Sequence, residues 1–296
     1  MKKVITIVYS RIARALAILV ENPALFVEFC YFEMKKTLLS FPEQRPYFKR
    51  RNIQVQLDYV YDKNIREMYA GSYEISTARI MKKFLESGSI FLDVGANIGY
   101  ISAIGMGLVG RRGEVHSFEP VPEYFGCLER LASLNPEYRL IPNQCALGDI
   151  EERANIYLSD YDIGSNTLVA GQLGGNLKGS PIGIDVIRLD SYIERFGLTG
   201  ISLIKIDVEG YEMRVLLGLS NYFEANVDRP PIICEINPES YCLQGLSTGD
   251  LENYMNGYGY RAYSDLNLNR RVDIKGLRKL TNVVFISDET WRSRRR

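Results

Sequence analysis

The sequence predicts an α/β fold in which a mostly parallel sheet carries helices on both faces. Two observations predict it. Short apolar runs of strand length are each followed by a stretch at helical spacing, which is the alternation of βαβ units. Charged residues and glycines directly follow several of these runs, as in open α/β sheets that bind ligands at the carboxyl ends of their strands. The four clearest runs are 90–94, 114–119, 201–206 and 232–236.

Helices are expected after each of these strands, and further elements at both ends of the chain. Residues 53–61 alternate apolar and polar side chains, which predicts a half-buried strand in a hairpin ahead of the main fold. Two late strands, 258–263 and 283–286, have no long helix between them and predict an antiparallel edge. The glycine-rich stretch 171–183 is typical of a loop, which we expect beside the site. The expected helices are 77–85, one starting at 98, 122–134, 210–217 and 249–255.

Composition excludes a collagen-like, a disordered and an acidic low-complexity chain. Of the 296 residues 46% are hydrophobic and 24% charged, which is near the globular average. The 36 basic and 36 acidic side chains cancel, so the whole chain offers no field that would attract nucleic acid. Five cysteines, without C-x-x-C spacing, disfavour a disulfide framework and favour a reducing, cytoplasmic compartment. The single histidine, His116, lies inside a predicted strand, so we expect it to be structural.

The charges are unevenly distributed along the chain. Residues 1–51 hold ten basic and four acidic side chains (10 − 4 = +6), and residues 270–296 hold nine and three (9 − 3 = +6). Residues 52–269 therefore carry −12. The basic residues 291–296 are expected to be a solvated tail.

The apolar segment Val4 to Val20 raises the question of a membrane. It is too short to span a bilayer and contains Arg11 and Arg14. We expect an accessory helix that packs on the domain or on a second subunit, with peripheral contact to an anionic membrane as the less favoured alternative. The stripe that would make this contact is Ile5, Val8, Ile12, Leu16 and Leu19.

The most specific local motif runs from Asp93 to Gly99, where a buried strand enters a glycine-rich turn and then a helix. Gly95 is expected to permit the tight turn and Gly99 a close approach of backbone to ligand. The dinucleotide fingerprint G-x-G-x-x-G is absent. Asp93 would repel a pyrophosphate and attract a cationic group, which disfavours an NAD-dependent oxidoreductase.

Glu119 ends the second strand, where folds of this type hold ribose hydroxyls through a carboxylate. Together with Asp93 it predicts a ligand made of adenosine and a positive, non-phosphate tail. S-adenosylmethionine fits that description. The plainer alternative is that both residues are surface carboxylates beside loops.

A second cluster of charges follows the strand 201–206. Lys205, Asp207 and Glu209 share one face if the strand geometry persists, and Glu235 ends the next strand on the same rim. Asp207, Glu209 and Glu235 are candidates for the general base of a methyl transfer. A divalent metal held by the same oxygens is the less favoured alternative, and a brace for Lys205 is the structural one.

These motifs resemble the FkbM-type family of S-adenosylmethionine-dependent methyltransferases over about residues 68–286. An upstream Gly71-Ser72-Tyr73-Glu74 resembles the family segment that closes over the cofactor. The other matching blocks, in the family's order and spacing, are Asp93–Gly99, Phe118-Glu119-Pro120, Cys145-Ala146-Leu147-Gly148-Asp149, Leu189-Asp190-Ser191-Tyr192 and Lys205–Glu212.

The resemblance implies a class I methyltransferase (Rossmann-like) fold of seven strands with the last antiparallel. It implies O-methylation of a small-molecule or glycan acceptor, without a nucleic-acid partner. A non-catalytic scaffold that binds an adenosine ligand is the alternative. The implied divisions are 1–67 as a helical and hairpin extension, 68–290 as the methyltransferase domain and 291–296 as the tail. The residues implied to bind cofactor are Tyr73, Glu74, Asp93, Gly95, Ala96, Asn97, Gly99, Glu119, Pro120, Ala146 and Asp207.

Overall fold

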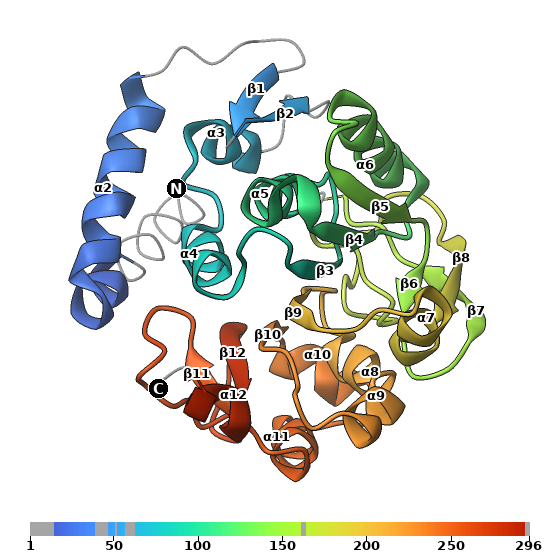
Figure 1. Ribbon diagram of the computed structural model, residues 1–296. Helices are drawn as coiled ribbons and strands as arrows, with labels where there is room; N and C mark the ends of the chain where they lie inside the picture. The colour runs from blue at the N-terminus through green and yellow to red at the C-terminus, as the bar shows by residue number, and fades with distance from the viewer. Residues whose placement is uncertain (1–14, 39–46, 51, 57–62, 161–163, 294–296) are drawn as a thin grey trace.

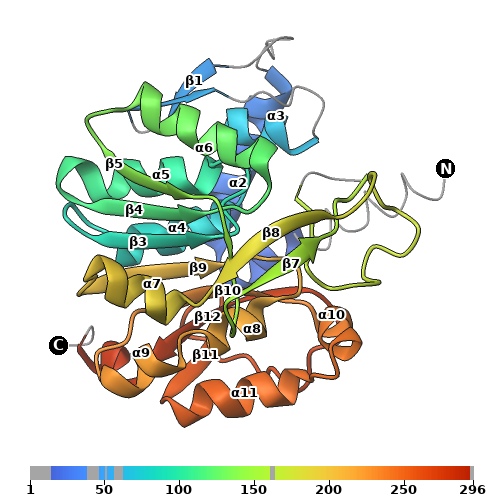
Figure 2. The same cartoon turned by 90° about the vertical axis from the view of Figure 1, so that its right-hand side faces the viewer.

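A central sheet of seven strands organises the computed structural model, which describes residues 15–38, 47–50, 52–56, 63–160 and 164–293. The strands lie in the order β11-β12-β10-β9-β3-β4-β5 (Figures 1 and 2). This is the order and strand number of a class I methyltransferase, as expected. The strands are β3 (Ile90–Val94), β4 (Glu114–Phe118), β5 (Arg139–Asn143), β9 (Ile201–Ile206), β10 (Ile232–Ile236), β11 (Tyr260–Ser264) and β12 (Thr281–Ser287).

Each face of the sheet has its own buried cluster. Successive side chains of a strand point to opposite faces, so Phe91 joins one cluster and Leu92 the other. The first cluster packs under α4 (Ile75–Phe84), α5 (Tyr100–Val109) and α6 (Pro122–Leu134). The second packs under α7 (Leu189–Phe196), α8 (Glu212–Leu217), α9 (Ser220–Ala225) and α11 (Thr248–Gly257). Because both faces of these strands are buried, their sequences are continuous apolar runs.

The two late strands form an antiparallel edge of the sheet, as expected. β12 pairs antiparallel with both β10 and β11, so it lies between them. β11 therefore forms the edge. The last strand along the chain, β12, is the antiparallel strand that the class I fold implies, and it lies between β10 and the edge strand β11.

Several elements were not expected. β5 closes the other edge of the sheet, and its sequence lacks a clear apolar run. A second sheet contains β6 (Ala146–Leu147), β7 (Glu152–Ile156) and β8 (Ile182–Ile187) in the order β6-β8-β7. It projects beyond the carboxyl ends of the central strands (Figure 2). The glycine-rich stretch is a connection as expected, but its last two residues begin β8. The remaining short helices are η1 (Gly110–Arg112), α10 (Pro238–Leu243) and α12 (Asp288–Ser293).

The N-terminal extension packs on the first face of the domain. A helical turn over residues 15–21 leads to α2 (Pro23–Leu38), then to the hairpin β1 (Tyr47–Arg50) and β2 (Ile53–Gln56), and to α3 (Lys63–Ala70). Asn135, the C-cap residue that follows α6, binds the hairpin. Its amide accepts a hydrogen bond from the Gln54 N–H (2.7 Å) and donates one to the Gln54 carbonyl (2.9 Å).

The hairpin confirms the strand expected from residue 53, while Leu57, Tyr59 and Tyr61 lie outside the described residues. Ile5, Val8 and Ile12 of the predicted stripe lie outside them too, as do Arg11, Arg14 and residues 294–296 of the tail. Within the described part of the chain, no helix is long and apolar enough to cross a membrane.

Leu16 and Leu19, the described members of the predicted stripe, do not pack on the domain. They are 55% and 40% exposed, and Ile18 is the side chain that is buried there. The division proposed after residue 67 falls inside α3 and stays a prediction.

The turn after β3 depends on Gly95. The Asp207 N–H donates to the Val94 carbonyl (3.1 Å), which extends the β3–β9 pairing by one residue past the end of β9. Gly95 has φ +78°, and a Cβ there would lie 1.8 Å from the Asp207 carbonyl oxygen.

Gly99 (φ +85°) has a different role, since it lets α6 pack closely. A Cβ on Gly99 would lie 2.9 Å from the Leu128 side chain of α6. The missing Cβ of Gly99 thus makes room for a helix, and Gly99 does not line the cavity, so its contact with a ligand stays a prediction.

We expect Gly95→Ala to destabilise the fold by more than the about 1–2 kcal/mol of left-handed strain alone, because the backbone of Asp207 must move. Gly88→Ala is the matched control, since Gly88 has φ +98° and an added methyl group would meet nothing within 4 Å. Urea unfolding of both variants measures the difference. Equal losses of stability would show that the carbonyl contact is unimportant.

Candidate active site

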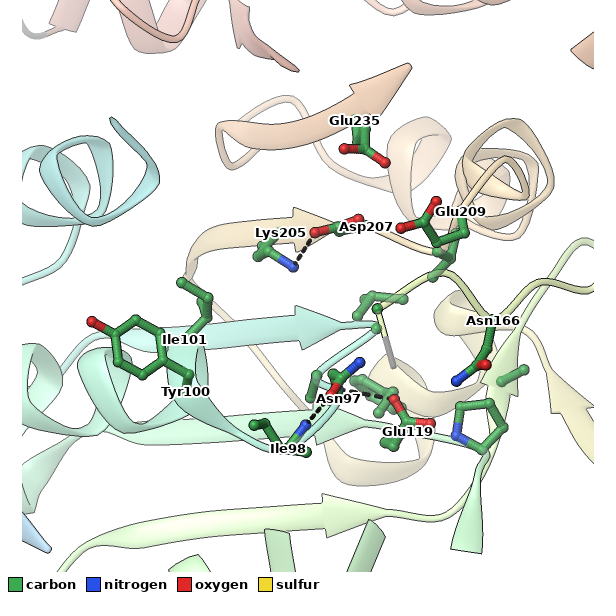
Figure 3. A pocket seen from close by; sticks show the side chains of 18 of the residues that line it. Asn97, Ile98, Tyr100, Ile101, Glu119, Asn166, Lys205, Asp207, Glu209 and Glu235 are labelled. Atoms are coloured by element: carbon green, nitrogen blue, oxygen red, sulfur yellow. Dashed lines mark hydrogen bonds and ion pairs between the residues drawn. The ribbon is translucent and has the colours of Figure 1, made fainter. Parts of the chain in front are cut away.

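A cavity of about 200 Å³ opens at the carboxyl ends of β3, β4, β9 and β10. Figure 3 shows its polar side chains converging from the ends of these strands. The turn 94–98 and the segment 118–120 form one wall. Asn64 and Met68 of α3 and the segment Tyr73–Glu74 form another. The predicted site residues that line it are Tyr73, Glu74, Gly95, Ala96, Asn97, Glu119, Pro120, Ala146, Asp207, Glu209 and Glu235.

Glu119 lies on the β4 side of the cavity and is only 5% exposed. One of its carboxylate oxygens accepts a hydrogen bond from the Asn97 N–H (2.9 Å), and the other accepts one from the Val121 N–H (2.9 Å). Each oxygen keeps a further acceptor site. Burial raises the pKa of Glu119 to about 7, against the lowering effect of the two backbone N–H groups. The carboxyl is thus rigidly held and can titrate near neutral pH.

Asp93 does not line the cavity, although the sequence motif suggested that it would face a cationic ligand. It is fully buried under α5, where one oxygen accepts from the Ser102 hydroxyl (2.5 Å). The other oxygen lies 3.9 Å from the Lys205 ammonium. Burial raises the pKa of Asp93, and Lys205 and Ser102 oppose that effect. The cation that Asp93 attracts is a residue of the protein itself.

Lys205 connects the buried Asp93 to the carboxylates that line the cavity. Its ammonium, 3.9 Å from Asp93, also lies 3.0 Å from a carboxylate oxygen of Asp207 at the cavity wall (Figure 3). Burial opposes its charge, but Asp207 and Asp93 more than offset this, so the pKa of Lys205 is raised above its ordinary value. Lys205 therefore stays protonated and orients Asp207 at the cavity wall. It lines the cavity itself, which we did not predict.

Asp207, Glu209 and Glu235 form a cluster whose carboxylate oxygens come within 4.8 Å of one another. One oxygen of Glu235 is buried without a hydrogen-bond partner. Burial, followed by the charges of Asp207 and Glu209, raises the pKa of Glu235 far above the ordinary range of a carboxyl group. The raised pKa favours the protonated form of Glu235. This argues against Glu235 as a general base and makes it a hydrogen-bond donor.

The expected common face for Lys205, Asp207 and Glu209 forms only in part. Glu209 does not continue the strand, because its backbone turns into the left-handed region (φ 52°). The buried carboxylate of Glu212 holds this turn by accepting from the Gly210 N–H (2.8 Å), and Thr167 donates to the Glu209 carbonyl (2.7 Å). Glu209 thus reaches the cluster through a turn fixed from both sides.

Backbone strain gathers around the cavity. Among the described residues other than glycine, four have positive φ, and three of these line the cavity: Glu74, Asn97 and Glu209. Such conformations cost of order 1–3 kcal/mol each and persist where the surrounding structure holds them. The Thr77 hydroxyl donates to Glu74 (2.5 Å), and the Asn97 side chain accepts from the Ile98 N–H (2.7 Å).

The sequence did not reveal the side chains that reach the cavity from other segments. Asn166 and its neighbours from the 157–181 connection line the cavity, as do Asn64 and Met68. Neither segment has a recognisable motif. The environment of His116 confirms that it is a structural residue. It is 1% exposed, lies outside the cavity, and is hydrogen-bonded to Tyr192 (2.7 Å) and Glu114 (3.2 Å).

The raised pKa of Glu119 predicts a pH dependence of stability. The folded protein holds a proton that the unfolded chain releases above about pH 4.5, so this stability is present at low pH and is lost as the pH rises through 7. The shift from 4.5 to about 7 corresponds to about 3 kcal/mol. We expect the loss of unfolding free energy between about pH 5 and about pH 8 to be smaller in Glu119→Gln than in the wild type.

Glu129→Gln, at an exposed site on α6, is the control and should keep the wild-type pH slope. Chemical denaturation at the two pH values measures both variants. A Glu119→Gln slope equal to that of the control would exclude Glu119 as the titrating group.

Comparison with known proteins agrees with this architecture. The family model of the methyltransferase FkbM domain matches residues 93–262. Methyltransferase 1 of Beauveria bassiana (strain ARSEF 2860) is 31% identical over 150 residues, which cover 45% of this chain and 59% of that protein. The 31-O-demethyl-FK506 methyltransferase FkbM of Streptomyces tacrolimicus is 28% identical over 206 residues, covering 61% of this chain and 76% of that protein.

Among solved structures, the methyltransferase FkbM from Methylobacillus flagellatus KT has 18% identity and a TM-score of 0.41, over 88% of this chain and 60% of that chain. The chain thus spans about three fifths of the Beauveria protein and of the Methylobacillus structure. The fold rests on the strand order of the central sheet rather than on this likeness. The family match covers more than half of the 296 residues and includes Glu119, Asp207, Glu209 and Glu235, and the chain belongs to the FkbM methyltransferase family.

Proposed function

We propose that the protein is an S-adenosylmethionine-dependent O-methyltransferase that acts on a hydroxyl group of a sugar, glycan or secondary metabolite. The observation that carries the proposal is the pairing of two features in one cavity. Glu119 lies at the end of β4, and the carboxylates Asp207, Glu209 and Glu235 lie at the ends of β9 and β10. Family membership supports the reaction class.

The residues present fit the cofactor. The free acceptor sites of Glu119 face the cavity and suit the two ribose hydroxyls of an adenosine. Gly95, Ala96, Asn97, Pro120 and Ala146 would line the cofactor beside it, and Tyr73 and Glu74 would cover it from the start of α4. When bound, the cofactor supplies the sulfonium methyl group.

The charge of the cavity constrains the acceptor. The carboxylates of Glu74, Asp207 and Glu209 are opposed by Lys205, which is already paired with Asp207. A phosphate, sulfate or carboxylate of the acceptor would be repelled at this rim, whereas hydroxyl groups can donate to the carboxylates. A neutral, hydroxyl-rich acceptor therefore fits best.

The protein would position the acceptor hydroxyl and remove its proton. Asp207 is the best base, since Lys205 fixes its carboxylate at 3.0 Å and it remains partly exposed to the cavity. Glu235, protonated, can donate a hydrogen bond to an acceptor oxygen. Glu209 would complete the acceptor contacts. In-line transfer needs chiefly this positioning.

Calorimetric titration tests the cofactor. We expect S-adenosylmethionine and S-adenosylhomocysteine to bind and NAD not to bind. Glu119→Ala should weaken binding by about 1.5–3 kcal/mol, the scale for hydrogen bonds to a charged group. Glu129→Ala is the control on the surface of α6. Unchanged affinity in a folded Glu119→Ala protein would contradict the ribose assignment, and binding without turnover of any acceptor would favour a scaffold.

Asp207→Asn tests the base. Turnover should fall by roughly 10²–10⁴, with much less effect on cofactor binding, because shape is kept while the charge is lost. Asp273→Asn, at an exposed site, should keep full turnover. Methyl transfer from labelled cofactor to candidate sugars and metabolites, followed by mass spectrometry, is the measurement.

A divalent cation at Asp207, Glu209 and Glu235 is the second candidate, because their oxygens come within 4.8 Å of one another. In that case a chelator would stop turnover of the wild type, and added Mg²⁺ or Mn²⁺ would restore it. If the carboxylates only brace Lys205, Asp207→Asn should lower the melting temperature and leave the turnover of the folded protein unchanged. Full turnover by both Asp207→Asn and Glu209→Gln would rule out the catalytic assignment.

A further inference from the structure

The N-terminal helices present an exposed apolar face. Within residues 15–35, where every side chain is described, nine are exposed and all nine are apolar or weakly polar. The most exposed are Val20 (81%) and Val27 (67%). This stretch holds half of the large apolar side chains that are exposed in the described part of the chain. We call the set the α2 face: Leu16, Leu19, Val20, Pro23, Ala24, Val27, Cys30, Tyr31 and Met34.

The opposite side of the same helices is firmly attached to the domain. Ile18 and Leu25 are buried against Ile75 of α4. The Asn22 side chain donates to the Leu266 carbonyl (2.8 Å), and Glu21 pairs with Arg270 (2.8 Å). The orientation of the helices is therefore fixed. Figure 1 shows α2 along the outer edge of the molecule, with α3 and α4 on its inner side.

The spacing of the α2 face matches that of paired helices. Six of its members recur at alternating intervals of four and three residues: 16, 20, 23, 27, 30 and 34. Apolar residues at an average interval of 3.5 form the seam along which two helices pack side by side. The break at Asn22 does not interrupt the line, because the Phe26 N–H still donates to the Asn22 carbonyl (3.0 Å).

We propose that the α2 face is the interface of a homodimer, in which it packs against the same face of a second copy of this chain. A two-fold interface is self-complementary, which a single apolar seam satisfies. The nine side chains present an area on the order of the 800 Å² per partner that stable interfaces bury. This surface is continuous over about five helical turns.

An anionic membrane fits the α2 face less well than a second copy does. The charged residues along its borders, Glu28, Glu33 and Lys35, are mostly acidic and would face the lipid phosphates. In a dimer the same carboxylates lie at the solvated rim of the interface, where charged residues are normal.

The dimer would also stabilise one wall of the cavity. α2 packs on α3, which contributes Asn64 and Met68 to the cavity. Ile75, which the N-terminal helices bury, directly follows Glu74 of the cavity wall. The interface thus lies one helix away from the site, and pairing would hold these helices in place.

The test compares two valines of nearly equal exposure. Val27→Glu places a charge in the centre of the seam, and Val227→Glu, at a site 69% exposed and remote from it, is the matched control. Sedimentation equilibrium over a wide range of concentration gives the mass of each protein, and circular dichroism gives its melting temperature. Val20→Glu is a second seam variant in case Val27→Glu does not fold.

We expect the wild type and Val227→Glu to have twice the mass of the chain, and the seam variants to show an about twofold lower mass with an unchanged circular dichroism spectrum. A monomeric wild type, or dimeric seam variants, would overturn the proposal. Sedimentation with phosphatidylglycerol vesicles is measured in parallel. A monomeric wild type that binds these vesicles, and loses binding in Val27→Glu, would identify the α2 face as a membrane surface instead.

Discussion

One backbone hydrogen bond, from the Asp207 N–H to the Val94 carbonyl, sets the geometry of the site. It joins the last residue of β3 to the residue that follows β9 and so brings two separate motifs into contact. The bond requires that residue 95 have no Cβ. The Gly95 and Ala96 N–H groups then donate to the Phe118 carbonyl, which brings the end of β4 to the same place. Main-chain hydrogen bonds thereby hold the ends of three strands together. The carboxylates at these strand ends have fixed positions because their backbone is fixed.

The electrostatics of the site are organised in two layers. In the buried layer, Lys205 lies between Asp93 and Asp207, so its charge is shared within the protein. In the layer that faces the cavity, burial and the charges of Asp207 and Glu209 raise the pKa of Glu235, which favours its protonated form. The result is a rim that both accepts and donates hydrogen bonds without presenting a positive charge.

The strands with both faces buried could be predicted from the sequence, and so could the residues at their ends, because a continuous apolar run followed by polar residues is a strong signal. Eleven of the predicted site residues line the cavity. Asp93 and Gly99 do not, since a motif does not tell whether a polar or small residue serves a ligand or the packing beneath it. β5 and the second sheet were missed because their side chains are partly exposed and mixed in polarity. Asn64, Met68 and Asn166 could not be found, because they reach the cavity through tertiary packing alone.

The attachment of the N-terminal extension has a consequence for the order of folding. The hairpin is bound by Asn135, 81 residues further along the chain, and Glu21 is bound by Ser264, 243 residues away. Contacts between such distant residues form late, because the intervening chain must first be ordered. The N-terminal helices therefore find their place only when β11, which contains Ser264, is formed. Because α2 packs on α3, the cavity wall that α3 provides is tied through the N-terminal helices to contacts with the late part of the chain.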